Sequence, residues 1–394
     1  MVVPGRFHAF DLTLALLNRH HQVTLFTNYP KWAVRKFGVP GQHVRSFWLH
    51  GVVARLFGEL HKLGLPTPEK ALTYWFSRWA TSQIQRERWD VIHSWSGFSE
   101  EVWALPNQSG TLKLLMRGSS HIQTQSQILE QEKKRSKKQF RAPKNWRIKR
   151  ETREYAGADK IRVLSGFAQK SFIDHGISSD KVWVLPLGTP VESFKPKPGI
   201  IEARRQRISS GKPLRVLYVG SITLRKGVYD IAKITRALKG KPFQFRLVGA
   251  IASEAKSFCQ AMADSVEFIS NQPQNRLPHW YAWADLFIFP TLEDGFAYVL
   301  AQAKASGLPI LATTNCAGPD LIEEAKTGWI LPIASPDLFV KRLLWCNEHR
   351  NELTEMIQRV TQSAHFANWD VAAKNFEDRC LEWLSKSPAS QSPA

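Results

Sequence analysis

The chain has 394 residues, 43% hydrophobic and 22% charged, which excludes an intrinsically disordered chain and is enough for two domains of ordinary size. Its net charge is +20 and uneven, because residues 1–210 hold 34 Lys and Arg against 16 Asp and Glu. No apolar run approaches the roughly 20 residues of a membrane span, and the four cysteines form no Cys-x-x-Cys pair, so neither a zinc site nor a disulfide framework is indicated.

The first half of the chain predicts a Rossmann-like α/β domain, because short apolar runs alternate with helical patterns. An opening strand has room only in residues 1–3, and a helix is expected over 10–18. Strands are expected over 23–27, 90–93, 112–116, 160–164 and 182–185. Since the start shows neither a charged region nor a long apolar core, we expect no signal peptide and a cytoplasmic location.

A basic segment stands out within this half, since residues 131–153 contain eleven Lys and Arg. Upstream of it, four apolar residues at helical spacing would share one helix face: Trp48, Val52, Leu56 and Leu63. Basic residues near an apolar face favour peripheral contact of residues 133–150 with an anionic membrane. A solvated basic surface is the plain alternative. We expect no nucleic-acid partner, because no binding motif is present and the aromatics do not alternate with the basic residues.

The second half alternates strands and helices more regularly. Strands are expected over 214–219, 243–248, 266–269, 286–290 and 309–313, and helices over 229–238, 254–262, 277–283, 298–306 and 320–324. This βαβα order predicts a parallel, doubly wound sheet. The fold class is therefore α/β, with two tandem Rossmann-like domains and a cleft between them.

Proline and glycine punctuate the boundary between the halves. We expect a basic N-terminal domain over 1–189, a linker over 190–213 and a C-terminal domain over 214–386. The last helix of the C-terminal domain is a candidate to pack back on the N-terminal one. Residues 387–394 are rich in Ser, Pro and Ala and are expected to form a disordered tail.

A glycine-bounded loop, residues 219–227, follows the first strand of the second half. Gly220 and Gly227 let the backbone turn tightly and approach a ligand. Arg225 and Lys226 place two cations at the carboxyl end of the strand, where a diphosphate would lie. Basic pairs are common on protein surfaces, so this pair alone does not indicate a phosphate site. Its place in the same domain as the next motif favours one.

Residues 289–303 join a buried strand to a helix, with Glu293, Asp294 and Gly295 between them. Ligands of open α/β sheets bind at such strand ends, and a helix N-terminus there favours phosphate. Carboxylates suit hydroxyl groups instead, although one acid can also cap the helix. A ligand that carries both phosphates and hydroxyls is a nucleotide sugar.

Together these segments resemble the family-4 glycosyltransferases, which have the two-domain GT-B fold. The family's Gly-Arg-Leu…Lys-Gly loop corresponds to residues 220–227, its acid-Gly-Phe-Gly…Glu-Ala segment to 294–303, and its Gly-x-Pro-Val strand to 307–310. The resemblance runs from about residue 90 to residue 369 and is carried by the order and spacing of the motifs. Two positions depart from the family pattern: Ser221 replaces an Arg and Gln302 replaces the second acid.

The resemblance implies a donor site in the C-terminal domain. Lys226 and Arg225 would bind the donor diphosphate, Asp294 and the backbone of 295–297 the donor sugar, and Gln302 the ribose. Gly249 and residues 270–272 would flank the base. The complete donor set is Gly220, Ser221, Arg225, Lys226, Gly249, Ser270, Asn271, Gln272, Glu293, Asp294, Gly295, Phe296, Ala297, Tyr298 and Gln302.

The acceptor side is implied for the N-terminal domain. A polar loop after the strand at 112–116 holds Arg117 where many family members have a His, and His121 follows four residues later. A lone His is more often structural than catalytic. The expected catalytic set is Asp294, His121, Arg117, Arg225 and Lys226. The expected acceptor set is Gly5, Arg6, His8 and His93.

The resemblance implies a retaining glycosyltransferase that moves a sugar from a UDP- or GDP-linked donor to a glycan, lipid-linked or other hydroxyl acceptor. No Asp-x-Asp motif is present, and the resemblance implies catalysis without a metal or other cofactor. The alternative is a degenerate protein that binds nucleotide sugars or serves in assembly, which Ser221 and Gln302 would favour.

Overall fold

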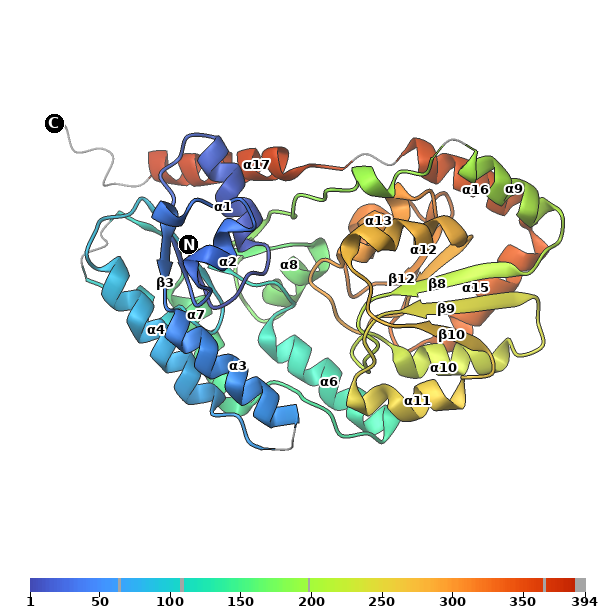
Figure 1. Ribbon diagram of the computed structural model, residues 1–394, viewed down its shortest axis with the longest axis horizontal. Helices are drawn as coiled ribbons and strands as arrows, with labels where there is room; N and C mark the ends of the chain where they lie inside the picture. The colour runs from blue at the N-terminus through green and yellow to red at the C-terminus, as the bar shows by residue number, and fades with distance from the viewer. Residues whose placement is uncertain (63–64, 107–109, 198, 364–365, 387–394) are drawn as a thin grey trace.

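The computed structural model describes residues 1–62, 65–106, 110–197, 199–363 and 366–386, and it shows two α/β units beside each other (Figure 1). The N-terminal unit has a seven-stranded sheet in the order β3-β2-β1-β4-β5-β6-β7. The C-terminal unit has a six-stranded sheet in the order β10-β9-β8-β11-β12-β13. The pairings in both sheets are parallel, which confirms the predicted pair of Rossmann-like sheets.

The strands of the N-terminal sheet are short and mostly buried. They are β1 (Val2–Val3), β2 (Leu25–Thr27), β3 (Val44–Ser46), β4 (Val91–Trp95), β5 (Leu112–Met116), β6 (Lys160–Val163) and β7 (Val182–Val184). The helices of this unit are α1 (Ala9–Asn18), α2 (Lys31–Arg35), α3 (Trp48–Lys62), α4 (Glu69–Ile84), α5 (Glu100–Trp103), α6 (Ile122–Ser136), α7 (Asn145–Gly157) and α8 (Gly166–Ile173).

The C-terminal unit follows the predicted alternation closely. Its strands are β8 (Leu214–Val219), β9 (Phe243–Val248), β10 (Val266–Ile269), β11 (Leu286–Phe289), β12 (Ile310–Thr313) and β13 (Gly328–Leu331). The helices are α9 (Ile200–Ser209), α10 (Val228–Ala237), α11 (Lys256–Ala261), α12 (Leu277–Trp283), α13 (Tyr298–Ala305), α14 (Gly318–Leu321), α15 (Pro336–Glu348), α16 (Arg350–Gln362) and α17 (Trp369–Lys386). All four residues of β11 are buried, as expected for a central parallel strand covered on both faces.

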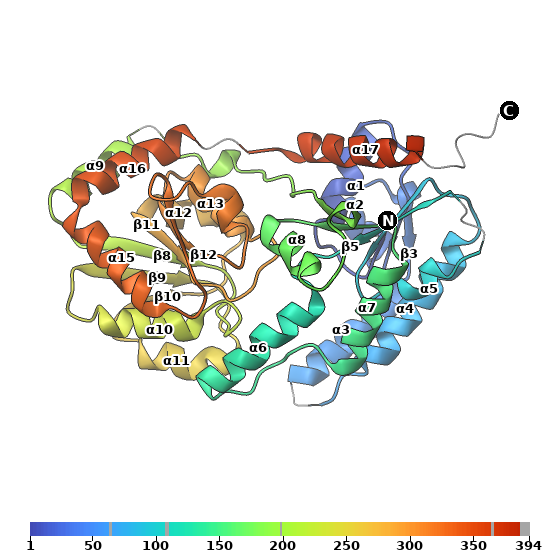
Figure 2. The same cartoon turned by 180° about the vertical axis from the view of Figure 1, so that it is seen from behind.

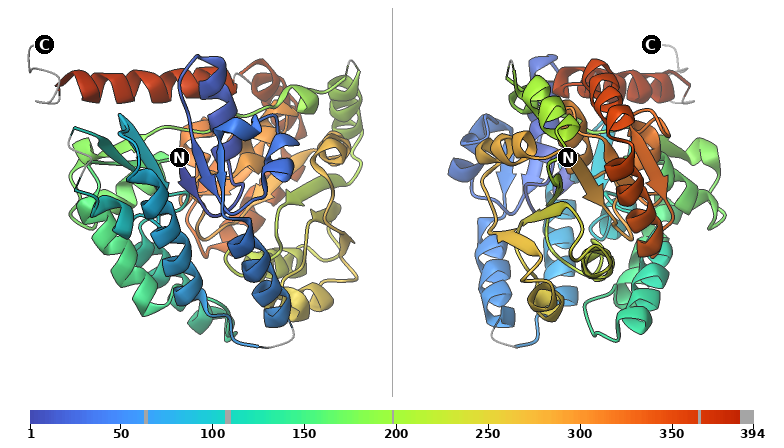
Figure 3. Two further views of the ribbon diagram at one scale, coloured as in Figure 1. Left: turned by 60° about the vertical axis from the view of Figure 1, so that its left-hand side comes forward. Right: turned by 90° about the vertical axis from the view of Figure 1, so that its right-hand side faces the viewer.

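The last helix lies over the N-terminal unit, although the sheet of the C-terminal unit precedes it in the chain (Figures 1 and 3). Phe376 and Cys380 of α17 share a buried cluster with Leu12 and Leu16 of α1. Arg19 supports this contact through an ion pair with Glu377 at 2.6 Å. The chain therefore crosses between the units twice, once before β8 and once before α17.

The basic segment is divided between two environments. Arg135, near the end of α6, forms a bidentate contact with Asp230 of α10, at 2.5 and 2.9 Å, and Lys138 lies over the ring of Phe258. Arg150 is fully buried against Glu100 and Glu101. Figure 2 shows α6 extending from the N-terminal unit to α10 and α11. Two basic residues of the segment predicted to contact a membrane thus have other roles. Arg135 links the two units, and Arg150 lies in the interior.

Among the described helices, none is long and apolar enough to cross a membrane. The four cysteines are all free and buried.

Candidate active site

The two units meet where the loop after β5 touches the loop after β11. Gly295 packs so closely on the backbone of Gly118 that a Cβ atom at Gly295 would collide with the Gly118 carbonyl oxygen. Both loops leave the carboxyl ends of parallel strands, the usual place for ligands in α/β proteins. The predicted cleft between the sheets is therefore lined by the segments that the sequence singled out.

The loop after β8 brings its two cations to this crevice. Gly227 has φ +84°, and a side chain there would collide with the Pro290 carbonyl oxygen, so the loop requires glycine at this turn. Arg225 donates from Nη1 to the Glu293 carbonyl at 2.8 Å. Lys226 forms an ion pair with Asp294 through Nζ. Burial lowers the pKa of Lys226, and Asp294 opposes this effect.

The segment after β11 turns sharply into α13. An oxygen of Asp294 accepts from the backbone N–H of Phe296 at 3.2 Å, a bond that fixes the turn. Ala297, where the family has Gly, adopts the left-handed conformation with φ +66°. The side chain of Gln302 is largely buried and accepts from the Tyr281 hydroxyl at 3.0 Å.

Glu293 connects the two units instead of facing open solvent. One of its carboxylate oxygens accepts from the Ser119 hydroxyl at 2.6 Å and from the Ser120 backbone at 2.8 Å. The other accepts from Gln125 at 3.0 Å and pairs with Arg225 at 3.3 Å. Burial alone raises its pKa, but Arg225 and the bonds from Ser119 and Ser120 outweigh this and lower the pKa to about 2. Glu293, predicted to bind the donor, is in this structure an ionised link between the loops.

One pocket of the crevice unites residues predicted for the donor and for the acceptor. Its volume is about 370 Å³, and its lining consists of Arg6, Phe7, His8, Asp11, Pro190, Gln274, Tyr298, Gln302 and Trp369. Burial, and secondarily Arg162, lower the pKa of His8 to about 3, so its ring is neutral at pH 7. The sequence analysis did not select Asp11, Gln274 or Trp369, which come from three separate elements and carry no local motif.

The remaining donor residues lie at strand ends along the same edge of the second sheet. Gly249 packs on the carbonyl of Gly220 at the ends of β9 and β8. The carbonyl of Ser221 accepts from the Tyr218 hydroxyl at 2.9 Å. Beyond β10, Gln272 donates to the Ser270 carbonyl at 3.1 Å, and Asn271 between them is exposed.

Two predicted histidines do not reach the crevice surface. His93 is 2% exposed and packs between Trp95 and Phe376. His121 is also 2% exposed; its ring stacks on His175, and its Nδ1 caps α6 by accepting from Gln123. Burial, with smaller effects of His175 and Arg117, lowers the pKa of His121 to about 3. The structure therefore gives both rings packing roles, and neither faces a substrate in this conformation.

Arg117 is buried as well, but it stands behind the contact loop. It donates to Glu151 at 2.7 Å, to Gln125 at 3.0 Å and to the Ser120 carbonyl at 3.0 Å. Because Gln125 also bonds Glu293, Arg117 supports the loop that touches the second unit. We assign it a positioning role.

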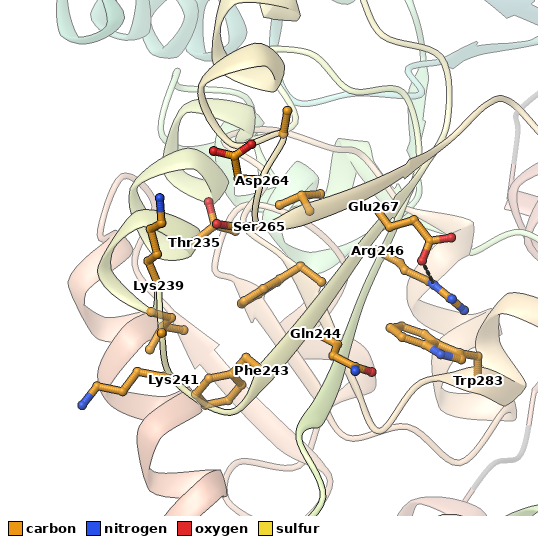
Figure 4. Close-up of a pocket in the computed structure, with 15 residues that line it drawn as sticks. Thr235, Lys239, Lys241, Phe243, Gln244, Arg246, Asp264, Ser265, Glu267 and Trp283 are labelled. Atoms are coloured by element: carbon orange, nitrogen blue, oxygen red, sulfur yellow. Dashed lines mark hydrogen bonds and ion pairs between the residues drawn. The ribbon is translucent and has the colours of Figure 1, made fainter.

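A larger hollow lies away from this site, at the amino ends of β9 and β10 (Figure 4). Its volume is about 710 Å³, and Lys239, Lys241, Asp264 and Trp283 line it. The carboxyl ends of the same strands carry the predicted donor residues, so the hollow is at the opposite end of the sheet. Size alone does not locate the active site here.

In the described part of the chain, no three His, Cys, Asp or Glu residues converge in a group that could hold a metal ion. Arg225 and Lys226 are the two cations that the loop after β8 brings to the crevice.

The fold and the crevice define a two-domain protein of the GT-B class. Family models match both units: "Glycosyltransferase Family 4" over residues 6–193 and "Glycosyl transferases group 1" over residues 213–349. Between them these matches cover most of the chain. The chain therefore belongs to the family-4, group 1 glycosyltransferases.

Individual relatives support this assignment at low identity. The amylovoran biosynthesis glycosyltransferase AmsK of Erwinia amylovora is 28% identical over 193 residues, which are 46% of this chain and 45% of AmsK. The GDP-mannose-dependent alpha-(1-6)-phosphatidylinositol monomannoside mannosyltransferase of Mycobacterium tuberculosis is 24% identical over a stretch that is 46% of this chain and 50% of that enzyme. The matches thus span about half the length of these curated relatives.

The crystal structure of HepE from Anabaena in complex with UDP is similar over nearly the full length. The superposition covers 97% of this chain and 98% of HepE, with a TM-score of 0.68. Because the two sequences are only 14% identical, the similarity supports the fold alone.

Proposed function

We propose that the protein is a retaining glycosyltransferase that moves a sugar from a UDP- or GDP-linked donor to a hydroxyl group of a glycan or lipid-linked acceptor. The observation that carries the proposal is the placement of Arg225 and Lys226 in the loop after β8. There they pair with Glu293 and Asp294, in the segment that leads into α13 and Gln302. UDP in the HepE structure and GDP-mannose in the name of the mycobacterial relative support this donor class.

Donor binding would exchange one ion pair for two better contacts. The Lys226 ammonium now bonds Asp294. A diphosphate carries more negative charge than one carboxylate and would draw Lys226 toward it. Asp294 would then be free to accept hydrogen bonds from the sugar hydroxyls. The pair Lys226–Asp294 thus holds both groups in place until the donor arrives.

In the transfer step, the bond between the anomeric carbon and the diphosphate oxygen breaks as the acceptor oxygen bonds that carbon from the same face. The acceptor proton passes to the departing phosphate oxygen. Arg225 and Lys226 stabilise the charge that develops on the diphosphate, and we propose that they do so without a metal ion. The two units meet closely at Gly295 and Gly118, and we propose that closure of the crevice around the donor excludes water from the reacting centre.

A turnover assay with UDP- and GDP-sugars and a membrane extract as the source of acceptor tests the proposal. Lys226→Ala should lower turnover by about 100-fold or more, as expected when a charge-stabilising donor is removed. Lys233→Ala is the matched control, because Lys233 lies on the exposed side of α10, over Tyr229. Wild-type turnover in Lys226→Ala would contradict the role of Lys226. Donor binding without any transfer or hydrolysis would favour the degenerate alternative.

We propose peripheral membrane contact through α3. Trp48, Val52 and Leu56 share one face of this helix and are 57%, 52% and 58% exposed; Leu63 lies outside the described residues. Exposed Lys134 and Lys137 add positive charge. The Trp48→Ser/Leu56→Ser variant should lose sedimentation with phosphatidylglycerol vesicles, whereas Leu381→Ser, on the exposed face of α17, should keep it. Equal sedimentation of both variants would reject this face.

A further inference from the structure

A second pocket of the crevice is strongly basic. It has a volume of about 270 Å³ and receives side chains from both units. Two carboxylates line it, those of Glu69 and Glu151. Five cationic side chains line it as well: Arg117, Arg141, Lys144, Arg147 and Arg225. We call it the basic pocket.

The carboxylates of the basic pocket are shared, so positive charge is left over. Glu151 accepts from Arg117 at 2.7 Å and from Arg147 at 2.9 Å. Glu69 pairs with both Arg141 and Lys144. Arg225 is the one lining cation that pairs with a carboxylate beyond the lining, that of Glu293. Burial and the neighbouring Arg147 lower the pKa of Arg141, as expected where cations are crowded.

The cations at the mouth share one carboxylate, that of Glu69, and are exposed enough to turn toward a ligand. The side chains of Arg141 and Lys144 are 63% and 59% exposed, whereas Arg117 and Glu151 form a buried floor. A planar guanidinium binds a phosphate through two parallel hydrogen bonds, and a phosphate ester carries about −1.5 to −2 charges at pH 7. The excess charge of the pocket therefore matches a phosphate better than a single carboxylate.

The basic pocket adjoins the place assigned to the donor diphosphate and shares only Arg225 with the pair of cations assigned there. Lys226 does not belong to its described lining, and its ammonium points to Asp294. Arg225 stands between the two places, since it lines the pocket and also bonds Glu293. The other four cations come from the N-terminal unit, the side expected to hold the acceptor.

We propose that the basic pocket binds a phosphate group of the acceptor, so that the acceptor is a phosphate ester and not a neutral glycan. The proposal rests on the proposed function and specifies its acceptor. A wider hollow of about 560 Å³ adjoins the pocket, shares Glu69 and Lys144 with it, and adds Tyr74 and Trp146. The rest of a phosphate ester, whether lipid or sugar, has room there.

Calorimetric titration with inorganic pyrophosphate tests the pocket. The titration uses the Lys226→Ala variant, in which the donor site is weakened, so that the second site is observed. Adding Arg141→Ala and Lys144→Ala should weaken pyrophosphate binding by about tenfold or more, because two charge-assisted contacts are lost. Adding Lys134→Ala and Lys149→Ala, two exposed residues of the same segment outside the lining, changes the net charge equally and should have little effect.

Equal weakening by both pairs of substitutions, or by neither, would overturn the pocket as a phosphate site. Displacement of pyrophosphate by farnesyl phosphate indicates a lipid acceptor, and displacement by glucose 6-phosphate indicates a soluble one. Displacement by neither compound would overturn the acceptor assignment. A different result would contradict the proposed function itself. UDP and GDP would then bind wild type and Lys226→Ala equally well, independently of the effect of Arg141→Ala.

Discussion

At the scale of single residues, the adjacent acids Glu293 and Asp294 make different contacts. Asp294 holds Lys226 and the turn into α13, whereas Glu293 reaches across to Ser119, Ser120 and Gln125. The sequence placed Asp294 in register with the family acid, and in the structure Asp294 forms an ion pair with Lys226. The sequence could not reveal that Glu293 bonds Ser119, Ser120 and Gln125, because these residues lie about 170 positions away in the other unit.

The low pKa of Glu293 predicts an acid-dependent loss of stability. A carboxyl whose pKa falls from 4.5 to about 2 on folding stabilises the protein above pH 4.5, and this contribution disappears as the pH falls from 4.5 toward 2. Urea unfolding of wild type and Glu293→Gln at several pH values should show a stability gap near pH 7 that shrinks over this range. A gap of constant size would contradict the assigned pKa. Glu352→Gln, at an exposed position of α16, serves as control.

Ala297 carries backbone strain that its glycine counterpart in the family avoids. The left-handed conformation costs a residue with a Cβ atom about 1 kcal/mol. Ala297→Gly should therefore raise the free energy of unfolding by up to about 1 kcal/mol in urea titrations. Ala303→Gly, in the buried interior of α13, should lower it instead. Destabilisation by Ala297→Gly would show that the methyl group's packing outweighs the strain.

At the scale of elements, the C-terminal unit was the more predictable. The observed bounds of β8, β9, β10 and α12 equal the predicted ones, because each is an apolar run between polar turns. The structure differs at α9, which lies inside the segment expected to be a linker. Gly199 and Gly211 indicated a flexible stretch, but they bracket a helix held by buried Arg204, whose partners are carbonyls about 100 residues away. β3 was also missed, since its three residues are too few for a period.

The contact between α6 and α10 predicts a second, electrostatic link between the units. Arg135 neutralises both Glu132 and Asp230, which are 2% and 1% exposed. Arg135→Ala would leave two buried carboxylates unpaired, so we expect a loss of about 3 kcal/mol and a larger radius of gyration in small-angle scattering. Lys134→Ala, one position away and exposed, should change neither quantity. An unchanged stability in Arg135→Ala would remove this link from the account.

At the scale of the whole molecule, the loops after β5 and β11 join the two units at Glu293. The pocket with Gln302 and the basic pocket both receive residues from the two units. Family resemblance predicted the donor side from local motifs, and the structure places these motifs at strand ends of the second unit. The sequence did not predict the basic pocket, because Arg141, Lys144 and Arg147 come together with Arg117 and Arg225 only in the folded chain. The buried positions of His93 and His121 were equally invisible, since burial depends on distant packing.

Hydrogen exchange with and without UDP or GDP tests the central claim most directly, namely that a nucleotide sugar binds between the units at the donor loop. We predict slower exchange in residues 219–228 and 293–302 with one of the two nucleotides, and no change in residues 239–246 and 264–267 around the hollow of Figure 4. Protection of the hollow with none at the donor loop would place the nucleotide at the wrong end of the sheet and contradict the account.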